Sequence, residues 1–133
     1  NAAIGRCFVL GKAVEDVKKH WQIVLDTQDA AAHQLVPGNC LTAAVTAANS
    51  LLERVGIPSL KGAWLHGIGY GWQEVPRCVD DSMCRPLREG MTIVVAPRLS
   101  FEGKDYCCMN VYKITQCGAV PMSIIPRELR ELY

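Results

Sequence analysis

Residues 64–76 read Trp64-Leu65-His66-Gly67-Ile68-Gly69-Tyr70-Gly71-Trp72-Gln73-Glu74-Val75-Pro76. Large side chains alternate with glycine in this segment, a pattern typical of a strand that another backbone or a ligand approaches closely. The imidazole of His66, followed eight residues later by the carboxylate of Glu74, could serve a hydrolytic site. A tightly packed sheet centre could use the same residues, so the segment leaves two interpretations open.

Two helices are predicted upstream of this segment. Apolar residues recur at helical spacing from Val14 to Leu35, and Pro37-Gly38 ends this first helix. A second helix, capped by Asn39 or Thr42, runs to a glycine C-cap at Gly56. A short β-prone run over residues 6–10 precedes both helices and predicts a first strand.

Strands dominate the second half of the chain. Apolar runs predict strands over residues 91–99, 106–114 and 119–122, with a hairpin turn at Glu102-Gly103. Pro126 is placed for the first turn of a C-terminal helix that ends at Tyr133. This order predicts an α+β fold in which two helices cover one face of a largely antiparallel, curved sheet.

Size and charge limit the function classes. A chain of 133 residues, half of them hydrophobic and a fifth charged, fits one folded domain. The net charge is +1 and the basic residues form no long run, which argues against direct binding of nucleic acid or a membrane surface. No apolar segment approaches the length of a membrane span.

The cysteines form no familiar metal or disulfide pattern. There are seven, an odd number, and none stands in a Cys-x-x-Cys spacing. We therefore expect reduced thiols and an intracellular location, in the cytoplasm or a mitochondrion.

Five short motifs follow one another along the chain in a recognisable order. They are Ile4-Gly5-Arg6-Cys7-Phe8, Leu65-His66-Gly67-Ile68-Gly69, Gln73-Glu74-Val75-Pro76, Leu87-Arg88-Glu89-Gly90-Met91 with Ala96-Pro97, and Thr115-Gln116-Cys117-Gly118. Together they resemble the pita-bread family, which includes methionine aminopeptidase, proline aminopeptidase, prolidase and creatinase.

The resemblance implies a domain organisation. Catalytic domains of that family are built from two similar αβ halves, and this chain aligns with the end of the first half and all of the second. We therefore expect residues 1–133 to form a single pita-bread-like domain whose first half is missing. We also expect other protein chains to cover the surface that the first half would occupy.

The resemblance also assigns the metal positions. Active members hold two divalent ions with two aspartates, one histidine and two glutamates. His66 keeps the histidine, but Ala3, Ala96 and Met109 stand where one aspartate and both glutamates would be. Gln73 replaces a second histidine that contacts substrate, so it would be a substrate-binding remnant. Because hard divalent ions need several oxygen or nitrogen ligands, we expect neither a metal nor another cofactor.

Three functional hypotheses remain. The first is a catalytically inactive domain that serves as a protein-binding or structural subunit of a larger assembly. The second is a metal-free, creatinase-type hydrolase of C–N bonds, with His66 as acid or base and Glu74 assisting. The third is a metallo-aminopeptidase whose ligands are completed by upstream residues.

Each candidate residue also has a purely structural interpretation. His66 can be a core histidine held by one hydrogen bond, and Glu74 can be an acid that caps a strand end. The aromatic residues Trp64, Tyr70 and Trp72 are expected to pack in the core, although Trp72 could anchor a partner.

Overall fold

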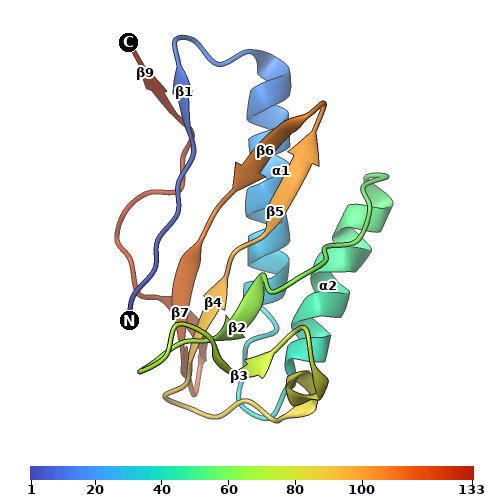
Figure 1. The fold of residues 1–133 in the computed structure, drawn as a ribbon, viewed down its shortest axis with the longest axis vertical. Helices are drawn as coiled ribbons and strands as arrows, with labels where there is room; N and C mark the ends of the chain where they lie inside the picture. Colours follow the sequence, from blue (N-terminus) through green and yellow to red (C-terminus); the bar gives the residue numbers. More distant parts are fainter.

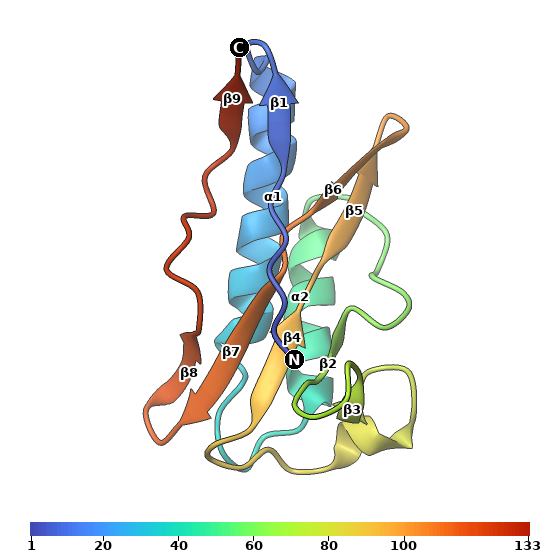
Figure 2. The ribbon, with the colours of Figure 1, turned by 60° about the vertical axis from the view of Figure 1, so that its left-hand side comes forward.

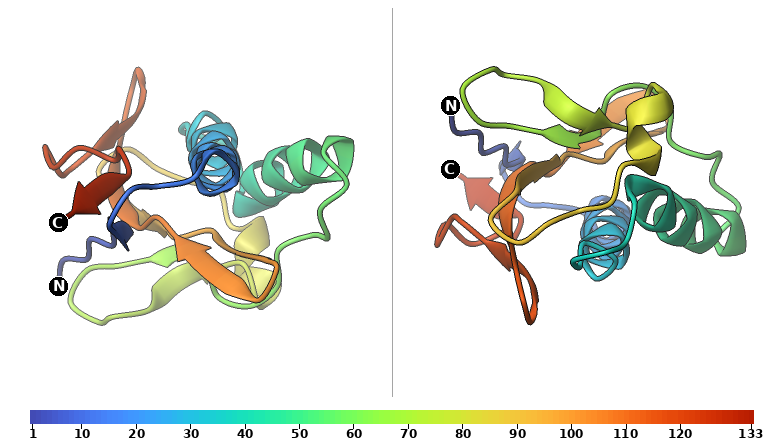
Figure 3. Two further views of the ribbon diagram at one scale, coloured as in Figure 1. Left: turned by 90° about the horizontal axis from the view of Figure 1, so that it is seen from above. Right: turned by 90° about the horizontal axis from the view of Figure 1, so that it is seen from below.

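The fold was analysed in a computed structural model that describes residues 1–133, except for the side chain of Asp81. Two helices lie on one face of a central sheet, as Figures 1 and 3 show. The helices are α1 (Glu15–Ala32) and α2 (Leu41–Arg54), and a short 3₁₀ helix, η1, covers Asp81–Cys84. The predicted α+β class and its single helical layer are confirmed.

The central sheet is antiparallel and has the strand order β3-β2-β4-β7-β8. Its strands are β2 (Leu65–Gly67), β3 (Glu74–Arg77), β4 (Thr92–Val95), β7 (Asn110–Thr115) and β8 (Gly118–Pro121). Both edge strands contain a proline, Pro76 in β3 and Pro121 in β8. Because proline donates no backbone hydrogen bond, these edges are poor templates for a further strand.

The main core lies between the helices and the sheet. One row of small and aliphatic side chains from the helices meets the helix-facing positions of β2, β4 and β7. Fully buried members include Leu35, Leu41, Ala44, Ala48, Leu65, Ile93, Val95 and Ile114. The alanines of α2 let its backbone approach α1 closely, which explains the small residues on its buried face.

The helix ends follow local chemistry. Gly56 has a positive φ of 74°, and its N–H donates to the Glu53 carbonyl while the Ile57 N–H donates to the Leu52 carbonyl. This pair of bonds is a Schellman motif and confirms Gly56 as the terminating glycine. The predicted N-cap was wrong: Cys40 holds that position, because the Asn39 amide instead donates to the carbonyl of Gln34.

The glycine-rich segment is not one strand. It forms β2, a loop over residues 68–73, and β3, which turns back to pair with β2. A Cβ atom on Gly67 would lie 2.7 Å from the carbonyl oxygen of Val75, so glycine is required where the two backbones meet. The expectation of a close backbone approach is therefore confirmed, although the approaching backbone belongs to the same segment.

Two predicted long strands are each divided. Residues 91–99 break at Ala96-Pro97 into β4 and β5 (Arg98–Phe101), and residues 106–114 break into β6 (Lys104–Cys107) and β7. The strands β5 and β6 leave the sheet as a separate hairpin, visible in Figure 2. The predicted hairpin turn at Glu102 and Gly103 is confirmed, and φ is positive at both residues.

The predicted C-terminal helix was wrong. Residues Arg130–Leu132 form β9, which pairs in parallel with β1 (Phe8–Leu10), and Figure 2 shows the two side by side. A segment this short gains little from helix formation alone, whereas the open edge of β1 offers backbone partners. The Glu131 carboxylate fixes the pairing further by accepting the Ala13 N–H at 2.9 Å.

Candidate functional site

The sheet face opposite the helices carries the positions that the resemblance assigns to metal ligands. His66 on β2 pairs with Val94 on β4, which pairs with Val111 on β7, so the three side chains share this face. Two residues further along their strands, Ile68 and Ala96 repeat the same orientation. We call this surface the sheet face.

The structure brings Ala3, Ala96 and Met109 together. Ala96 is buried beside Ile68, Val94 and Val111, and Ala3, Cys107 and Met109 pack against the same cluster. Ala3 lies in this cluster because Gly5 and Met109, the residue before β7, form an isolated antiparallel bridge. The bridge holds the N-terminal segment beside the start of that strand. The resulting cluster is apolar throughout.

His66 is buried on this face, with 3% of its surface exposed. Its Nδ1 lies 2.8 Å from the Gly67 carbonyl oxygen, so Nδ1 carries the proton and donates it there. The Trp72 ring lies beside the imidazole at an interplanar angle of 59°, with 6.0 Å between the ring centroids. The contacts match the structural interpretation of a core histidine held by one hydrogen bond.

Glu74 lies on the other side of the strand pair. It pairs with Gly67, whose face is opposite that of His66. Its carboxylate accepts the backbone N–H of Gly71 and closes the loop that precedes β3. Gln73 is exposed to solvent. The structure therefore gives Glu74 a loop-capping contact and does not bring it to the imidazole.

The donor set at these positions does not fit a pair of hard divalent ions. Ala3 and Ala96 offer no donor atom, and the Met109 thioether is a soft ligand. His66 alone supplies one nitrogen. Within the described residues, no group of three or more histidine, cysteine or acidic side chains is arranged to hold a metal ion.

The neighbouring thiols are shielded rather than activated. Burial raises the pKa of Cys107 and of Cys108, so both thiols stay protonated near neutral pH. The Sγ atom of Cys7 lies 3.5 Å from both the backbone N and the backbone O of Cys107. The thiol of Cys7 therefore packs against the backbone of Cys107.

An apolar groove of about 470 Å³ adjoins the sheet face. Its walls are residues 1–4, the ends of three central strands and the segment 122–125, and none of its lining side chains is charged. Ile124 is fully exposed at its rim, and Met122 is mostly exposed. Such an apolar concavity is typical of binding surfaces.

The aromatic residues of the glycine-rich segment divide between core and surface. Trp64 is buried as expected, but Tyr70 is fully exposed and Trp72 is about half exposed. The prediction of core packing was therefore wrong for both, because the segment turns outward as a loop after Ile68 and does not continue as a strand.

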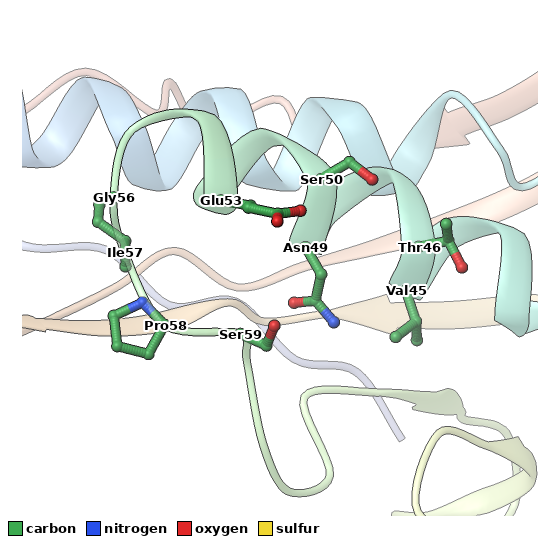
Figure 4. A pocket seen from close by; sticks show the side chains of 9 residues that line it. All are labelled: Val45, Thr46, Asn49, Ser50, Glu53, Gly56, Ile57, Pro58 and Ser59. Atoms are coloured by element: carbon green, nitrogen blue, oxygen red, sulfur yellow. The ribbon is translucent and has the colours of Figure 1, made fainter.

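A larger open groove lies on the helical side of the molecule. It measures about 660 Å³ and runs between α2 and the segment 56–59, as Figure 4 shows. Thr46, Asn49, Ser50 and Glu53 line it from the helix. None of the candidate residues lies in this groove, and its polar side chains are those of an ordinary solvated helix surface.

Sequence reasoning missed three polar residues that organise the structure. Arg6 donates to the carbonyls of Gly5, Met109, Ile125 and Pro126 and to Oδ1 of Asn110. Gln28, fully buried on α1, donates to the carbonyls of Val95 and Cys108. Arg127 pairs with Asp29 and also donates to Gln28.

These contacts join the N-terminal segment to the start of β7 and the C-terminal segment to α1. The indole of Trp21 adds a hydrogen bond to the carbonyl of Arg127 at 2.8 Å. One signal could have found Gln28, because it occupies the apolar stripe of α1 between Val24 and Ala31.

Comparison with known proteins supplies the family. The sequence profile of metallopeptidase family M24 matches residues 1–120. The chain belongs to metallopeptidase family M24. A search of curated proteins finds no significant match. No helix among the described residues is both long enough and apolar enough to span a bilayer.

Solved structures agree on the fold. The prolidase from Pyrococcus horikoshii OT3 is 27% identical with a TM-score of 0.85, over 96% of this chain and 37% of that one. The dipeptidase PepE from Mycobacterium ulcerans is 25% identical with a TM-score of 0.85, over 96% and 35%. The X-Pro aminopeptidase from Thermotoga maritima MSB8 is 24% identical with a TM-score of 0.86, over 97% and 36%.

These values confirm the pita-bread resemblance. They also show that the M24 chain spans little more than a third of the length of these three relatives. The activity of a whole relative therefore does not pass to this chain by similarity alone.

Proposed function

We propose that this M24 chain is catalytically inactive and serves as a protein-binding or structural subunit of a larger assembly. One observation carries the proposal: Ala3, Ala96 and Met109 pack into a single apolar cluster beside His66. A dinuclear site needs carboxylates at such positions, and this cluster offers none. Apolar side chains there remove the repulsion that closely placed, metal-free carboxylates would suffer.

The apolar groove supports the binding half of the proposal. It opens next to the cluster and is framed by the exposed side chains of Ile4, Met122 and Ile125. Exposed apolar surface of this kind is costly unless something covers it. A partner protein with an apolar surface that packs into the groove would do so.

Metal analysis tests the loss of the dinuclear site. The purified chain is incubated with Mn²⁺, Co²⁺ or Zn²⁺, desalted and measured by mass spectrometry, with the Pyrococcus horikoshii prolidase as a positive control. We expect far less than one ion per chain and no cleavage of an X-Pro dipeptide. Near-stoichiometric metal, or turnover that a chelator abolishes, would refute the proposal.

Surface variants test the binding role. Ile124→Asp places a charge at the groove, and Val55→Asp places the same charge at a half-exposed site after α2. A partner that wild type retains should be lost from the Ile124→Asp variant and kept by Val55→Asp. Equal retention by both variants would exclude the groove as the binding surface.

A metal-free hydrolase is the second candidate. In the neutral imidazole, a proton on Nδ1 that is donated to the Gly67 carbonyl puts the free lone pair on Nε2, the form that a general base needs. This candidate predicts C–N bond hydrolysis that survives chelation and disappears in His66→Ala. The 3% exposure of the imidazole and the opposite orientation of Glu74 weigh against it.

A further inference from the structure

Two cysteines lie opposite each other beyond the bridge between Gly5 and Met109. Two positions further along each segment, toward β1 and back into β6, stand Cys7 and Cys107. Directly opposed residues of an antiparallel pair have Cα atoms about 4.5–5.5 Å apart. A disulfide spans about 4.4–6.8 Å between its Cα atoms. The register of the bridge therefore predicts a separation between Cys7 and Cys107 that a disulfide can span.

The contacts of the Cys7 thiol agree with this register. Its Sγ accepts the N–H of Cys107 at 3.5 Å and lies 3.5 Å from the carbonyl oxygen of the same residue. Since the N–Cα bond is about 1.46 Å long, this sulfur lies within about 5 Å of the Cα of Cys107. The thiol of Cys7 thus takes the place of the next backbone hydrogen bond of the ladder.

The two sulfur atoms are not held apart by other bonds. Both cysteines are partly exposed, and Sγ of Cys107 has no hydrogen-bond partner among the described residues. Cys7 packs beside Leu99, whereas Cys107 packs beside Val111 on the sheet face. A disulfide therefore requires rotation of at least one of the two side chains about its Cα–Cβ bond.

A cavity of about 330 Å³ gives a small oxidant access to Cys7. It lies between β1 and β6, and its lining includes Cys7, Val17, Tyr106 and Leu129. Cys107 does not line it, so Cys7 meets a reagent from solution first. Burial raises the pKa of the Cys107 thiol, which makes it a poor attacker of reagents in solution. Reaction with a sulfur held beside it benefits from a high effective concentration.

We propose that Cys7 and Cys107 form a modification site, a thiol pair that a small organic disulfide oxidises. The Cys7 thiolate attacks one sulfur of the reagent, breaks its S–S bond and releases one thiolate. The Cys107 thiolate then attacks the Cys7 sulfur, releases the second thiolate and closes the bond between the two cysteines. The protons of the two cysteines pass to the released thiolates, so two protein thiols are oxidised and one disulfide is reduced to two thiols. This pair is independent of the proposed function, because neither cysteine lines the apolar groove.

Peptide mapping of the whole chain tests the proposal. The folded chain is treated with glutathione disulfide, blocked with N-ethylmaleimide and digested with trypsin. Cleavage after lysine and arginine gives the peptides 7–12, which contains Cys7, and 105–113, which contains Cys107 and Cys108. We expect a cross-link between these two peptides as the main disulfide product. Glutathione bound to separate cysteines without this cross-link, or a cross-link between other peptides in its place, would overturn the proposal.

Single variants identify the sulfur atoms. Cys107→Ser should stop the reaction at a mixed disulfide between Cys7 and glutathione, and Cys7→Ser should leave Cys107 reduced. Cys108→Ala is the matched control, because it removes the neighbouring thiol from the same peptide. Cys108 is fully buried and donates to Oε1 of Gln28 at 3.4 Å, so the cross-link should remain without it. A cross-link that survives in Cys107→Ser and disappears in Cys108→Ala would refute the assigned pair.

The same treatment in urea shows whether the folded contact is the cause. An unfolded chain has no register, so its cysteines should pair as a mixture and the yield of this cross-link should fall severalfold. An equal yield of the cross-link between Cys7 and Cys107 in the folded and unfolded chains would contradict the proposal.

Discussion

Gly5 and Met109 exchange both of their backbone hydrogen bonds, with N–O distances of 3.0 and 3.1 Å. This bridge holds the N-terminal segment beside β7, although Gly5 and Met109 are 104 positions apart in the sequence. A Cβ atom on Gly5 would lie 2.9 Å from the Met109 Cβ, closer than side chains tolerate. The bridge therefore sets the position of Ala3 in the apolar cluster.

Gly5→Ala should destabilise the chain by about 1–3 kcal/mol, because the new methyl group collides with Met109. Urea denaturation measures the change in the free energy of unfolding. In a Met109→Gly background the collision partner is absent, so the same Gly5→Ala change should cost much less. An equal cost in both backgrounds would show that the contact between these two residues is not the cause.

Gln28→Leu should cost about 2–4 kcal/mol, because the buried carbonyls of Val95 and Cys108 lose their donor and Arg127 loses an acceptor. Gln22→Leu provides the matched control. Gln22 lies on the exposed side of the same helix and bonds only to Asp26, so its loss should change stability by less than about 0.5 kcal/mol. Similar urea midpoints for the two variants would contradict the assigned role of Gln28.

The repeat of apolar residues along the chain predicted the helices and the central strands, because the burial of their residues follows the period of the element. The helical spacing of Trp21, Val24 and Ala32 and the apolar runs in β4 and β7 identified the two layers, because each pattern reflects burial on one face. The same reasoning assigned no role to Gln28 or Arg127. Their partners lie 67 to 99 residues away, and no local pattern records such contacts.

The failures have a common physical origin. The tail became β9 because β1 offered it an edge, and the strand over 91–99 broke because Pro97 cannot donate a ladder hydrogen bond. At the site, alternation along β2, β4 and β7 places His66, Ala96 and Met109 on one face. Alternation could not assign Glu74 to a face of the sheet. The loop over residues 68–73 reverses the chain before Glu74, and a loop has no regular repeat through which the alternation could be extended.

Stability should fall as the pH rises above about 8.5, the ordinary pKa of cysteine. Burial raises the folded-state pKa of Cys107 and Cys108, so the unfolded chain loses these protons first and binds fewer of them than the folded chain. The stabilisation is fully present below the unfolded pKa and is lost as the pH rises through the folded pKa. Urea denaturation between pH 7 and pH 10 measures this slope.

Cys108→Ala should flatten that slope, since it removes one of the two groups that cause it. The exposed Cys117 provides the comparison, and Cys117→Ala should leave the slope as in wild type. A slope that is the same in all three proteins would assign the alkaline loss of stability to other groups, among them Tyr112, whose pKa burial also raises.

Glu74→Ala should loosen the loop over residues 68–73 without unfolding the sheet. The Glu74 carboxylate accepts the Gly71 N–H, and its Oε2 would lie 2.8 Å from a Cβ on Gly69, so it packs directly against the loop it closes. Hydrogen exchange at Gly71 should become at least tenfold faster, as expected for the loss of a bond to a charged acceptor. Glu53→Ala, an exposed acid on α2, is the control and should leave this exchange unchanged. If Gly71 exchanges equally fast in wild type and in Glu74→Ala, the carboxylate does not hold the loop. Glu74 would then be free to move and would again be a candidate partner of His66.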